Sequence, residues 1–228
     1  MISSLPIYVS IVFILTTLLT VFLFYKATAR SKTTLVVIFA WLLLQSILAF
    51  SGFYTVTDTF PPRFALTALP AILFIIGIFV TARGRSYIDS LDTKTLTLLH
   101  IVRIPVEICL YWLFLYKAVP QLMTFAGRNF DILSGITAPI VYFVCFKNSQ
   151  LKNRKLLLVW NFICLGLLLN IVINALLSAP FPFQQFAFDQ PNIAILYFPF
   201  TWLPCFIVMI VLYSHLTAIR RLIIYRKE

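Results

Sequence analysis

Hydrophobic residues are grouped into seven long runs, and short polar stretches separate the runs. Each run has about 18 to 25 residues, the length that a helix needs to cross a hydrocarbon core of about 30 Å. The pattern therefore predicts an all-α integral membrane protein built as a seven-helix bundle. The predicted helices cover residues 6–25, 33–54, 64–80, 95–116, 129–146, 156–178 and 193–216.

Prolines and a glycine interrupt three of these runs. Pro105 removes one backbone hydrogen bond from the fourth predicted helix and frees the carbonyl of Ile101 for a polar partner. Pro199 and Pro204 predict a kinked or broken seventh helix. Gly135 predicts a close approach between the fifth helix and a neighbour.

The composition supports a membrane location. The chain is 61% hydrophobic and 11% charged, with a mean hydropathy of +0.99, whereas soluble domains average about 45–50% and about 25%. The longest connections have about fifteen residues, too few for a separate soluble domain, so we expect a single domain over residues 1–228. No basic stretch precedes the first run, which predicts a retained helix rather than a removed signal peptide.

Lysine and arginine are distributed unequally between the two predicted sides of the membrane. Fourteen fall in the first, third and fifth connections and the C-terminal tail, and only three fall in the other connections. By the positive-inside rule this asymmetry predicts an N-terminus outside and a C-terminus in the cytoplasm. The fourteen are Lys26, Arg30, Lys32, Arg83, Arg85, Lys94, Lys147, Lys152, Arg154, Lys155, Arg220, Arg221, Arg226 and Lys227.

The net charge of +11 follows from these loops, so it does not indicate nucleic acid binding. The expected partners are the lipid bilayer of a plasma or bacterial inner membrane, a small-molecule or ion ligand, and a second copy of the chain. A retinal cofactor would need a lysine in the last helix for its Schiff base, as in microbial rhodopsins, and residues 193–216 contain none.

The fourth predicted helix carries three ionisable residues on one stripe. His100, Arg103 and Glu107 fall within roughly 60° of one another on a helix, with Tyr111 beside them. Ionisable residues inside a membrane are costly, and they usually face a protein interior or a water-filled path. The stripe predicts a ligand or ion site. The alternative is an internal pair between Arg103 and Glu107, four residues apart, that only fastens helices together.

Polar residues in the fifth and sixth predicted helices could complete such a site. Asp131 begins the fifth helix, where Arg128 or Arg63 at the membrane interface is the simplest partner. We expect Asn129 at the same outer mouth. In the sixth helix Asn170 and Asn174 lie one turn apart and Asn161 lies on roughly the opposite face; these could join helices or line a pore.

Metal binding has weak support in the sequence. His100 and His215 are expected at similar depth and could share a metal or relay a proton, although nothing in the sequence shows that they meet. The four cysteines lie in apolar runs without CxxC spacing, so we expect them to be small core residues.

The connection 179–192 contains four phenylalanines among three prolines. It could form part of an aromatic belt at the membrane surface or a lid over an outward-facing cavity.

The leading hypothesis is a bundle that binds a small or ionic ligand in a polar core and transports or senses it. An intramembrane enzyme that uses Glu107 or Asp131 with His100 on a lipid-like substrate is an alternative, but HExxH and GxSxG motifs are missing from the sequence. A cofactor-holding bundle and a structural membrane partner without chemistry are the others.

Overall fold

The computed structural model describes residues 2, 5–147 and 150–224 of the chain. It is all-helical apart from one short hairpin, with 72% of its residues in helices. Within these residues, five helices are long and apolar enough to cross a membrane. A bent pair of helices could form one further span.

The helices are α1 (Ile7–Ala27), α2 (Lys32–Phe50), α3 (Ala65–Val80), α4 (Ala82–Ser90), α5 (Thr93–Leu99), α6 (Arg103–Leu115), α7 (Ile132–Cys145), α8 (Arg154–Leu177) and α9 (Val208–Ile224). Short 3₁₀ turns occupy Phe53–Thr55, His100–Val102, Gln121–Met123 and Ala194–Leu196, and a π-helical turn, Leu203–Ile207, leads into α9. Strands β1 (Phe146–Lys147) and β2 (Gln150–Leu151) pair antiparallel, with Phe146 opposite Leu151.

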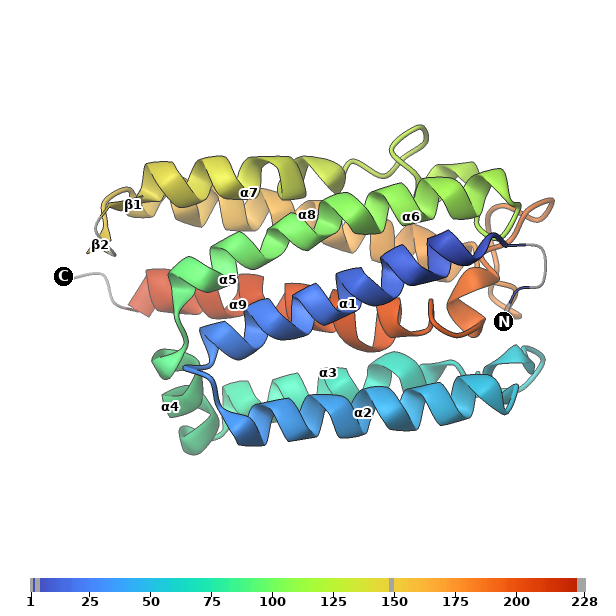
Figure 1. The fold of residues 1–228 in the computed structure, drawn as a ribbon, viewed down its shortest axis with the longest axis horizontal. Coiled ribbons are helices and arrows are strands. Elements are labelled where there is room, and N and C mark those ends of the chain that lie inside the picture. Colours follow the sequence, from blue (N-terminus) through green and yellow to red (C-terminus); the bar gives the residue numbers. More distant parts are fainter. Residues whose placement is uncertain (1, 3–4, 148–149, 225–228) are drawn as a thin grey trace.

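The long helices run roughly parallel to one axis of the molecule (Figure 1). Helix α9 occupies a central position, in contact with α8, α5 and α3, while α7 packs on both α6 and α8. Helices α2 and α3 form a layer on one side of α1 and α9, and α7 and α8 lie on the other side (Figure 1). The broken helix α5–α6 therefore lies between the α1 and α7 sides of the bundle.

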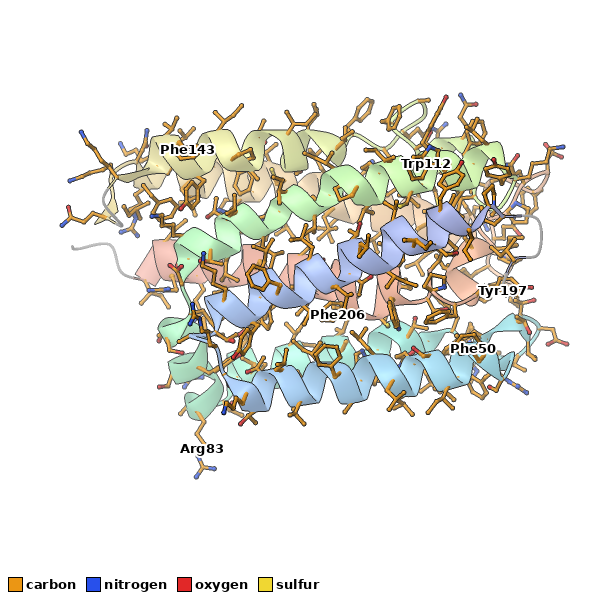
Figure 2. All side chains as sticks on the ribbon, in the orientation of Figure 1. Phe50, Arg83, Trp112, Phe143, Tyr197 and Phe206 are labelled. Atoms are coloured by element: carbon orange, nitrogen blue, oxygen red, sulfur yellow. The ribbon has the colours of Figure 1, made fainter. Side chains whose placement is uncertain are left out.

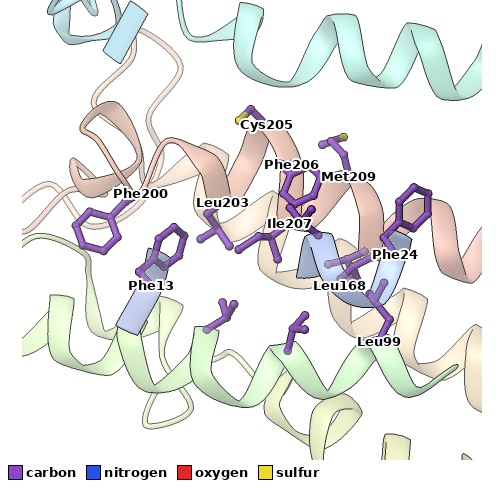
Figure 3. Close-up of a cluster of buried hydrophobic side chains, with 14 of the residues drawn as sticks. Phe13, Phe24, Leu99, Leu168, Phe200, Leu203, Cys205, Phe206, Ile207 and Met209 are labelled. Atoms are coloured by element: carbon purple, nitrogen blue, oxygen red, sulfur yellow. The ribbon is translucent and has the colours of Figure 1, made fainter. Parts of the chain in front are cut away.

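Large apolar side chains fill the space where α1, α5–α6, α8 and the start of α9 meet (Figure 3). Phe13 of α1 packs against Phe200, with ring centroids 5.1 Å apart, and Leu99 is fully buried. Many apolar side chains on the outer faces of the helices are exposed, including Phe143 at 76% and Phe74 at 63%. An apolar outer surface around a packed interior is compatible with a membrane location.

Basic segments far apart in the sequence gather at one end of the bundle (Figure 1). The end of α1, helix α4, the β1–β2 hairpin and the end of α9 all lie there. Arg220 pairs with Asp89 of α4, and Arg221 donates to the Leu91 carbonyl and the Thr93 hydroxyl. These contacts tie the end of α9 to the α4–α5 connection.

Helix α4 turns sharply across this end. Its axis makes an angle of 93° with that of α3, and the Thr81 hydroxyl caps its first turn by accepting from the Gly84 amide. A Cβ on Gly84 would lie only 2.1 Å from the Ile78 carbonyl oxygen, so the tight return requires glycine here.

The expected start of the seventh helix is wrong. Residues 193–202 form a 3₁₀ turn and further turns rather than the first part of a membrane helix, and regular helix begins only after the π-helical turn. Pro199 and Pro204 explain the difference, because proline lacks an amide donor and disfavours helix at the residue before it. The prolines therefore mark a late start of this helix and not the kink or break within it that we expected.

Two other segments contain less helix than a full span. Helix α3 has 16 residues and α7 has 14, or about 24 Å and 21 Å at 1.5 Å per residue. The fifth predicted helix was expected from residue 129 and begins at Ile132. Its missing first turn belongs to a chain segment that enters the bundle and carries part of the polar site.

The Phe-rich connection 179–192 packs against neighbouring loops. Phe181 is buried and its ring lies 5.4 Å from that of Phe64, whereas Phe188 is 70% exposed. The Gln190 amide donates to the carbonyls of Phe114 and Val119 at 3.0 and 2.6 Å. These contacts anchor the connection over the end opposite the basic one.

Candidate functional site

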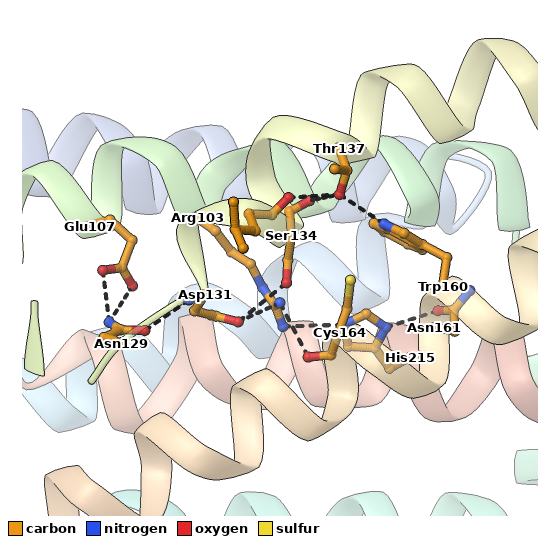
Figure 4. A network of polar contacts seen from close by, with 11 residues as sticks. Arg103, Glu107, Asn129, Asp131, Ser134, Thr137, Trp160, Asn161, Cys164 and His215 are labelled. Carbon is orange, nitrogen blue, oxygen red and sulfur yellow. Dashed lines mark hydrogen bonds and ion pairs between the residues drawn. The ribbon is translucent and has the colours of Figure 1, made fainter. Parts of the chain in front are cut away.

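An ion pair between Arg103 and Asp131 forms the centre of a buried polar network (Figure 4). The Arg103 guanidinium Nη1 lies 2.7 Å from the Asp131 carboxylate Oδ1, and both residues are at most 5% exposed. Arg103 is the first residue of α6, and Asp131 directly precedes α7. A carboxylate at this position also interacts favourably with the N-terminal end of the α7 dipole. The charges are thus paired where an isolated one would be costly.

Asn129 connects this pair to Glu107. Its amide nitrogen lies 2.7 Å from both Glu107 carboxyl oxygens and 3.0 Å from the Met123 carbonyl, and its side-chain oxygen accepts from the Asp131 amide at 3.0 Å. Asn129 is completely buried. Both ends of one side chain therefore hold the entering segment against α6 (Figure 4).

His215 of α9 extends the network to the opposite side of Arg103. Its Nε2 lies 3.1 Å from Arg103 Nη2, and its Nδ1 lies 2.8 Å from the Asn161 side-chain oxygen. Since a guanidinium can only donate, Nε2 must accept, and Nδ1 then carries the proton that Asn161 accepts. The Asn161 nitrogen donates in turn to the Leu157 carbonyl at 2.8 Å. The partners thus select the neutral Nδ1–H tautomer of His215.

His100 lies against His215 and brings the 3₁₀ turn into the site. The two imidazole rings stack with centroids 3.9 Å apart, and Trp160 meets the His100 ring edge-on at 5.3 Å. His100 Nδ1 and Arg103 Nε are buried without a hydrogen-bond partner among the described residues. Such orphaned polar atoms are unusual in folded proteins.

Glycine permits this close assembly. A Cβ on Gly135 of α7 would lie 2.8 Å from Cγ1 and 3.0 Å from the backbone nitrogen of Ile104, and 3.3 Å from the Arg103 Cβ. Helix α7 therefore approaches α6 more closely than a larger residue allows. The approach expected from the sequence is present, and it brings Asp131 to Arg103.

Several predicted partnerships differ in the structure. Arg103 forms its ion pair with Asp131 and not with Glu107, four residues along the same helix. The expected interfacial partners of Asp131 are elsewhere: the Arg63 guanidinium lies over the Phe53 ring and that of Arg128 over Phe186. Asp131 lies close to α6, so its short side chain reaches the Arg103 guanidinium directly. Arg103 therefore does not turn back along its own helix towards Glu107.

Three predicted site residues lie outside the network. Tyr111 stacks on Phe125 with centroids 4.9 Å apart. Asn170 is exposed and donates to the Arg128 carbonyl at 2.9 Å, and Asn174 donates to the Asn170 carbonyl at 2.9 Å. Asn170 thus ties α8 to the α6–α7 connection, whereas the hydrogen bonds of Asn174 stay within α8.

Asn129 and Asn161 are the site residues that the sequence did not identify. Asn129 was expected at the outer mouth, yet it lies in the interior with zero exposure. Asn161 was placed on the face opposite Asn170 and Asn174, and this face of α8 proves to be the one that contacts His215. The predicted stripe of His100, Arg103 and Glu107 lies in the network, and Asp131 joins it.

The structure gives the weak metal hypothesis little to build on. No group of three or more His, Cys, Asp or Glu side chains with metal-binding geometry occurs in the described ranges 2, 5–147 and 150–224. His100 and His215 do meet, but both nitrogens of His215 are already engaged by Arg103 and Asn161. All four cysteines are buried and unbridged, as expected of core residues.

The fold and the site describe a class of protein: an all-helical chain with several membrane-length apolar helices around a charged interior. More specifically, the chain belongs to the family described as "Domain of unknown function (DUF8737)", which matches residues 63–223. The matched region contains α3 to α9 and every residue of the polar network. No curated protein and no solved structure matches the chain.

Proposed function

We propose that the protein is a seven-helix membrane protein that binds a small or ionic ligand at the Arg103 network and transports or senses it through protonation of Glu107. The supporting observation is the buried ion pair joined on one side to Glu107 and on the other to His215. The gathering of basic segments at one end of the bundle supports an N-terminus outside and a C-terminus in the cytoplasm.

The charges of the network make Glu107 the group that changes state. Arg103 and Asp131 neutralise each other at 2.7 Å, whereas the neutral amide of Asn129 is the hydrogen-bonding partner of Glu107. A proton on Glu107 leaves the network neutral, and its loss leaves one unbalanced negative charge in the interior. Buried charge of this kind is relieved by a proton or a cation, and loss of the proton also draws the Arg103 guanidinium from Asp131 towards Glu107.

The two histidines supply a path from Arg103 towards the basic end. His215 accepts from Arg103, and His100 stacks upon it with Nδ1 unpartnered. When Arg103 moves away, His215 Nε2 loses the hydrogen bond that it accepts from the guanidinium. The imidazole is then no longer restricted to the Nδ1–H tautomer. Arg103 is the proposed contact for an anionic group or the counter-charge, and His100 is the inner relay. Asn129 orients the Glu107 carboxyl.

Proton flux tests the proposal. The full chain is reconstituted in vesicles loaded with a pH-sensitive dye, and a pH gradient is applied with the membrane potential clamped. Flux is expected in the wild type, lost in Glu107→Gln and retained in Asp58→Asn, which removes an exposed loop carboxyl. Equal flux in Glu107→Gln, or none in the wild type, would overturn the proton-coupled form of the proposal.

Ligand retention tests the binding step separately. Native mass spectrometry of the gently purified chain is expected to show a small polar molecule that is lost in Arg103→Ala and kept in Arg85→Ala, a change at an exposed arginine. The same bound mass in both variants would remove Arg103 from the binding site.

A structural role is the second candidate. It is favoured by the direct, short contacts of Arg103 with α7, α8 and α9: Asp131 at 2.7 Å, the Cys164 carbonyl at 3.4 Å and His215 at 3.1 Å. One side chain thereby fastens four helices. On this alternative Glu107→Gln changes neither flux nor ligand retention, while substitution of Arg103 unfolds the bundle.

A further inference from the structure

A large apolar cavity lies on the side of the bundle away from the polar network. It has a volume of about 630 Å³ and is enclosed by α2, α3, α4 and α9, with Phe24 of α1 at its inner wall. This volume lies within the range of about 300–1,000 Å³ that is typical of small-molecule sites. Phe206 of the π-helical turn and Met209 of α9 line it, and Figure 2 shows Phe206 between the α1–α9 and α2–α3 layers.

Hydrogen bonds from two tryptophans fix the walls of the cavity. The indole N–H of Trp41 on α2 donates to the Cys205 carbonyl at 2.9 Å, and that of Trp202 donates to the Ser46 hydroxyl at 3.0 Å. Helix α2 is therefore held across from the π-helical turn. The cavity beside Trp41 therefore lies next to a helix that these hydrogen bonds hold in place.

The cavity opens between α2 and α3 towards the apolar outer surface. Val37 and Phe74 line it and are 52% and 63% exposed. Its lining is almost entirely hydrocarbon and aromatic, which fits an acyl chain. A chain that enters from the bilayer would cross no polar barrier at this opening.

One end of the cavity is polar and basic. Thr33 and Thr34 stand in the first turn of α2, and Arg83 and Gly84 stand in the first turn of α4. Ser31 and Thr81 already accept from the amides of Thr34 and Gly84. The amides that precede these two in each helix have no intrahelical acceptor and carry the positive end of the helix dipole, so they attract anions. Arg83 lines this end of the cavity, and its side chain extends outwards from α4 (Figure 2), so it adds a full positive charge at the rim of the cavity.

A second observation within the cavity points to a missing partner. Tyr213 lines it and is only 3% exposed, and its hydroxyl is among the buried polar atoms that lack a hydrogen-bond partner in the described residues. A buried hydroxyl without a partner costs free energy that an ester or head-group oxygen would recover.

We propose that this cavity binds one anionic phospholipid, with an acyl chain between α2, α3 and α9 and the phosphate at the N-terminal ends of α2 and α4 beside Arg83. Charge decides the class of occupant, because Arg83 is the one charged residue among the described residues that line the cavity, and it is a cation. The same end carries the basic loops that place it at the cytoplasmic surface, where anionic lipids are concentrated. This site is separate from the Arg103 network and requires no chemistry there.

Native mass spectrometry tests the proposal with the full chain released from nanodiscs of equal parts phosphatidylcholine and phosphatidylglycerol. The wild type is expected to retain one phosphatidylglycerol. Ala71→Phe, which fills the cavity from α3, is expected to lose it, whereas Ala40→Phe, on the exposed face of α2, is expected to keep it. Arg83→Gln is expected to lower the preference for phosphatidylglycerol about fivefold, and Arg85→Gln to leave it unchanged.

Equal retention in Ala71→Phe and Ala40→Phe, a wild type that keeps phosphatidylcholine equally well, or a bound fatty acid in place of the phospholipid would overturn the proposal. A measurement on the unsubstituted cavity covers the case in which Ala71→Phe fails to fold. Phosphatidylglycerol with brominated acyl chains is expected to quench Trp41, measured as the difference between the wild type and Trp41→Phe, at lower mole fraction than brominated phosphatidylcholine. Identical quenching by the two lipids would contradict the site.

Discussion

Arg103 and His215 lie 112 residues apart in the sequence and meet in the interior, with Arg103 Nη2 3.1 Å from His215 Nε2. The contact joins the break between α5 and α6 to the middle of α9. It also fixes the protonation pattern of the imidazole, because a guanidinium leaves its neighbour only the acceptor role. The ion pair, the tautomer and the packing of four helices thus depend on one another.

A double-mutant cycle measures how strongly Arg103 and Asp131 depend on each other. Arg103→Met and Asp131→Leu are each expected to lower the free energy of unfolding by about 3–5 kcal/mol, because each leaves a buried charge without its partner. The double variant is expected to lose less than the two single losses combined. Reversible unfolding in mixed micelles gives the three values. Strict additivity would show that the 2.7 Å contact has no energetic weight.

Substitution of His215 is expected to destabilise the protein by more than the loss of ring packing, because the hydrogen bonds of His215 to Arg103 and Asn161 are lost as well. His215→Phe keeps the aromatic shape but removes both nitrogens, so Arg103 Nη2 and Asn161 lose their partners. An unfolding free energy lower by about 1–3 kcal/mol is expected.

Trp160→Phe is the control for His215→Phe, since it retains an aromatic ring against His100 and removes one hydrogen bond, to Thr137, together with part of the indole ring. We expect a smaller loss for it, of about 1 kcal/mol. Equal losses in the two variants would mean that the hydrogen bonds of His215 contribute nothing beyond packing.

A pair of glycine substitutions tests the close approach of α7 to α6. Gly135→Ala forces its Cβ against Ile104 and is expected to destabilise the protein by about 1–3 kcal/mol. Gly166→Ala, in the interior of α8, meets nothing within 4 Å and is expected to be neutral or to stabilise by up to about 1 kcal/mol. Thermal unfolding of both variants in the same detergent provides the comparison, and the expected order of stability is Gly166→Ala above Gly135→Ala. The reverse order would refute the packing argument.

The proposed topology predicts the behaviour of reporter fusions. A fluorescent protein fused after the last helix is expected to fluoresce, and alkaline phosphatase at the same position to be inactive, because the C-terminus is cytoplasmic. Phosphatase inserted in the 116–131 connection is expected to be active. An active phosphatase at the C-terminus would contradict the orientation. If insertions on either side of one predicted helix gave the same reporter result, that helix would not cross the membrane and the number of spans would be smaller.

The sequence predicted an all-helical chain with apolar segments, because apolar composition is a local property. The predicted count of seven is not confirmed, since the described residues contain five helices of membrane-spanning length and one bent pair. The structure brings the predicted stripe of His100, Arg103 and Glu107 into one network, and whether that network is a functional site stays a prediction. The start of α9 was misjudged because apolar composition alone cannot separate a membrane helix from buried turns. Pro199 and Pro204 were the available signal, and they mark where regular helix is delayed.

The partnerships within the site could not be read from the sequence. An i,i+4 spacing favours Arg103 with Glu107, but Asp131 is delivered to the guanidinium by a segment that enters the bundle before α7. Asn129 has an ordinary loop sequence around it, and nothing local shows that it becomes fully buried. The apolar faces of α8 differ too little to reveal that Asn161, and not Asn170, faces the interior.

The central claim is that Glu107 gains and loses a proton inside the bundle, beside the ion pair of Arg103 and Asp131. Infrared difference spectra of the full chain in membranes, recorded between acidic and alkaline buffer, test it most directly. We expect a protonated-carboxyl band that reverses with pH, shifts in deuterated water, persists in Asp58→Asn and is missing in Glu107→Gln. Identical carboxyl bands in the wild type and Glu107→Gln would contradict the account.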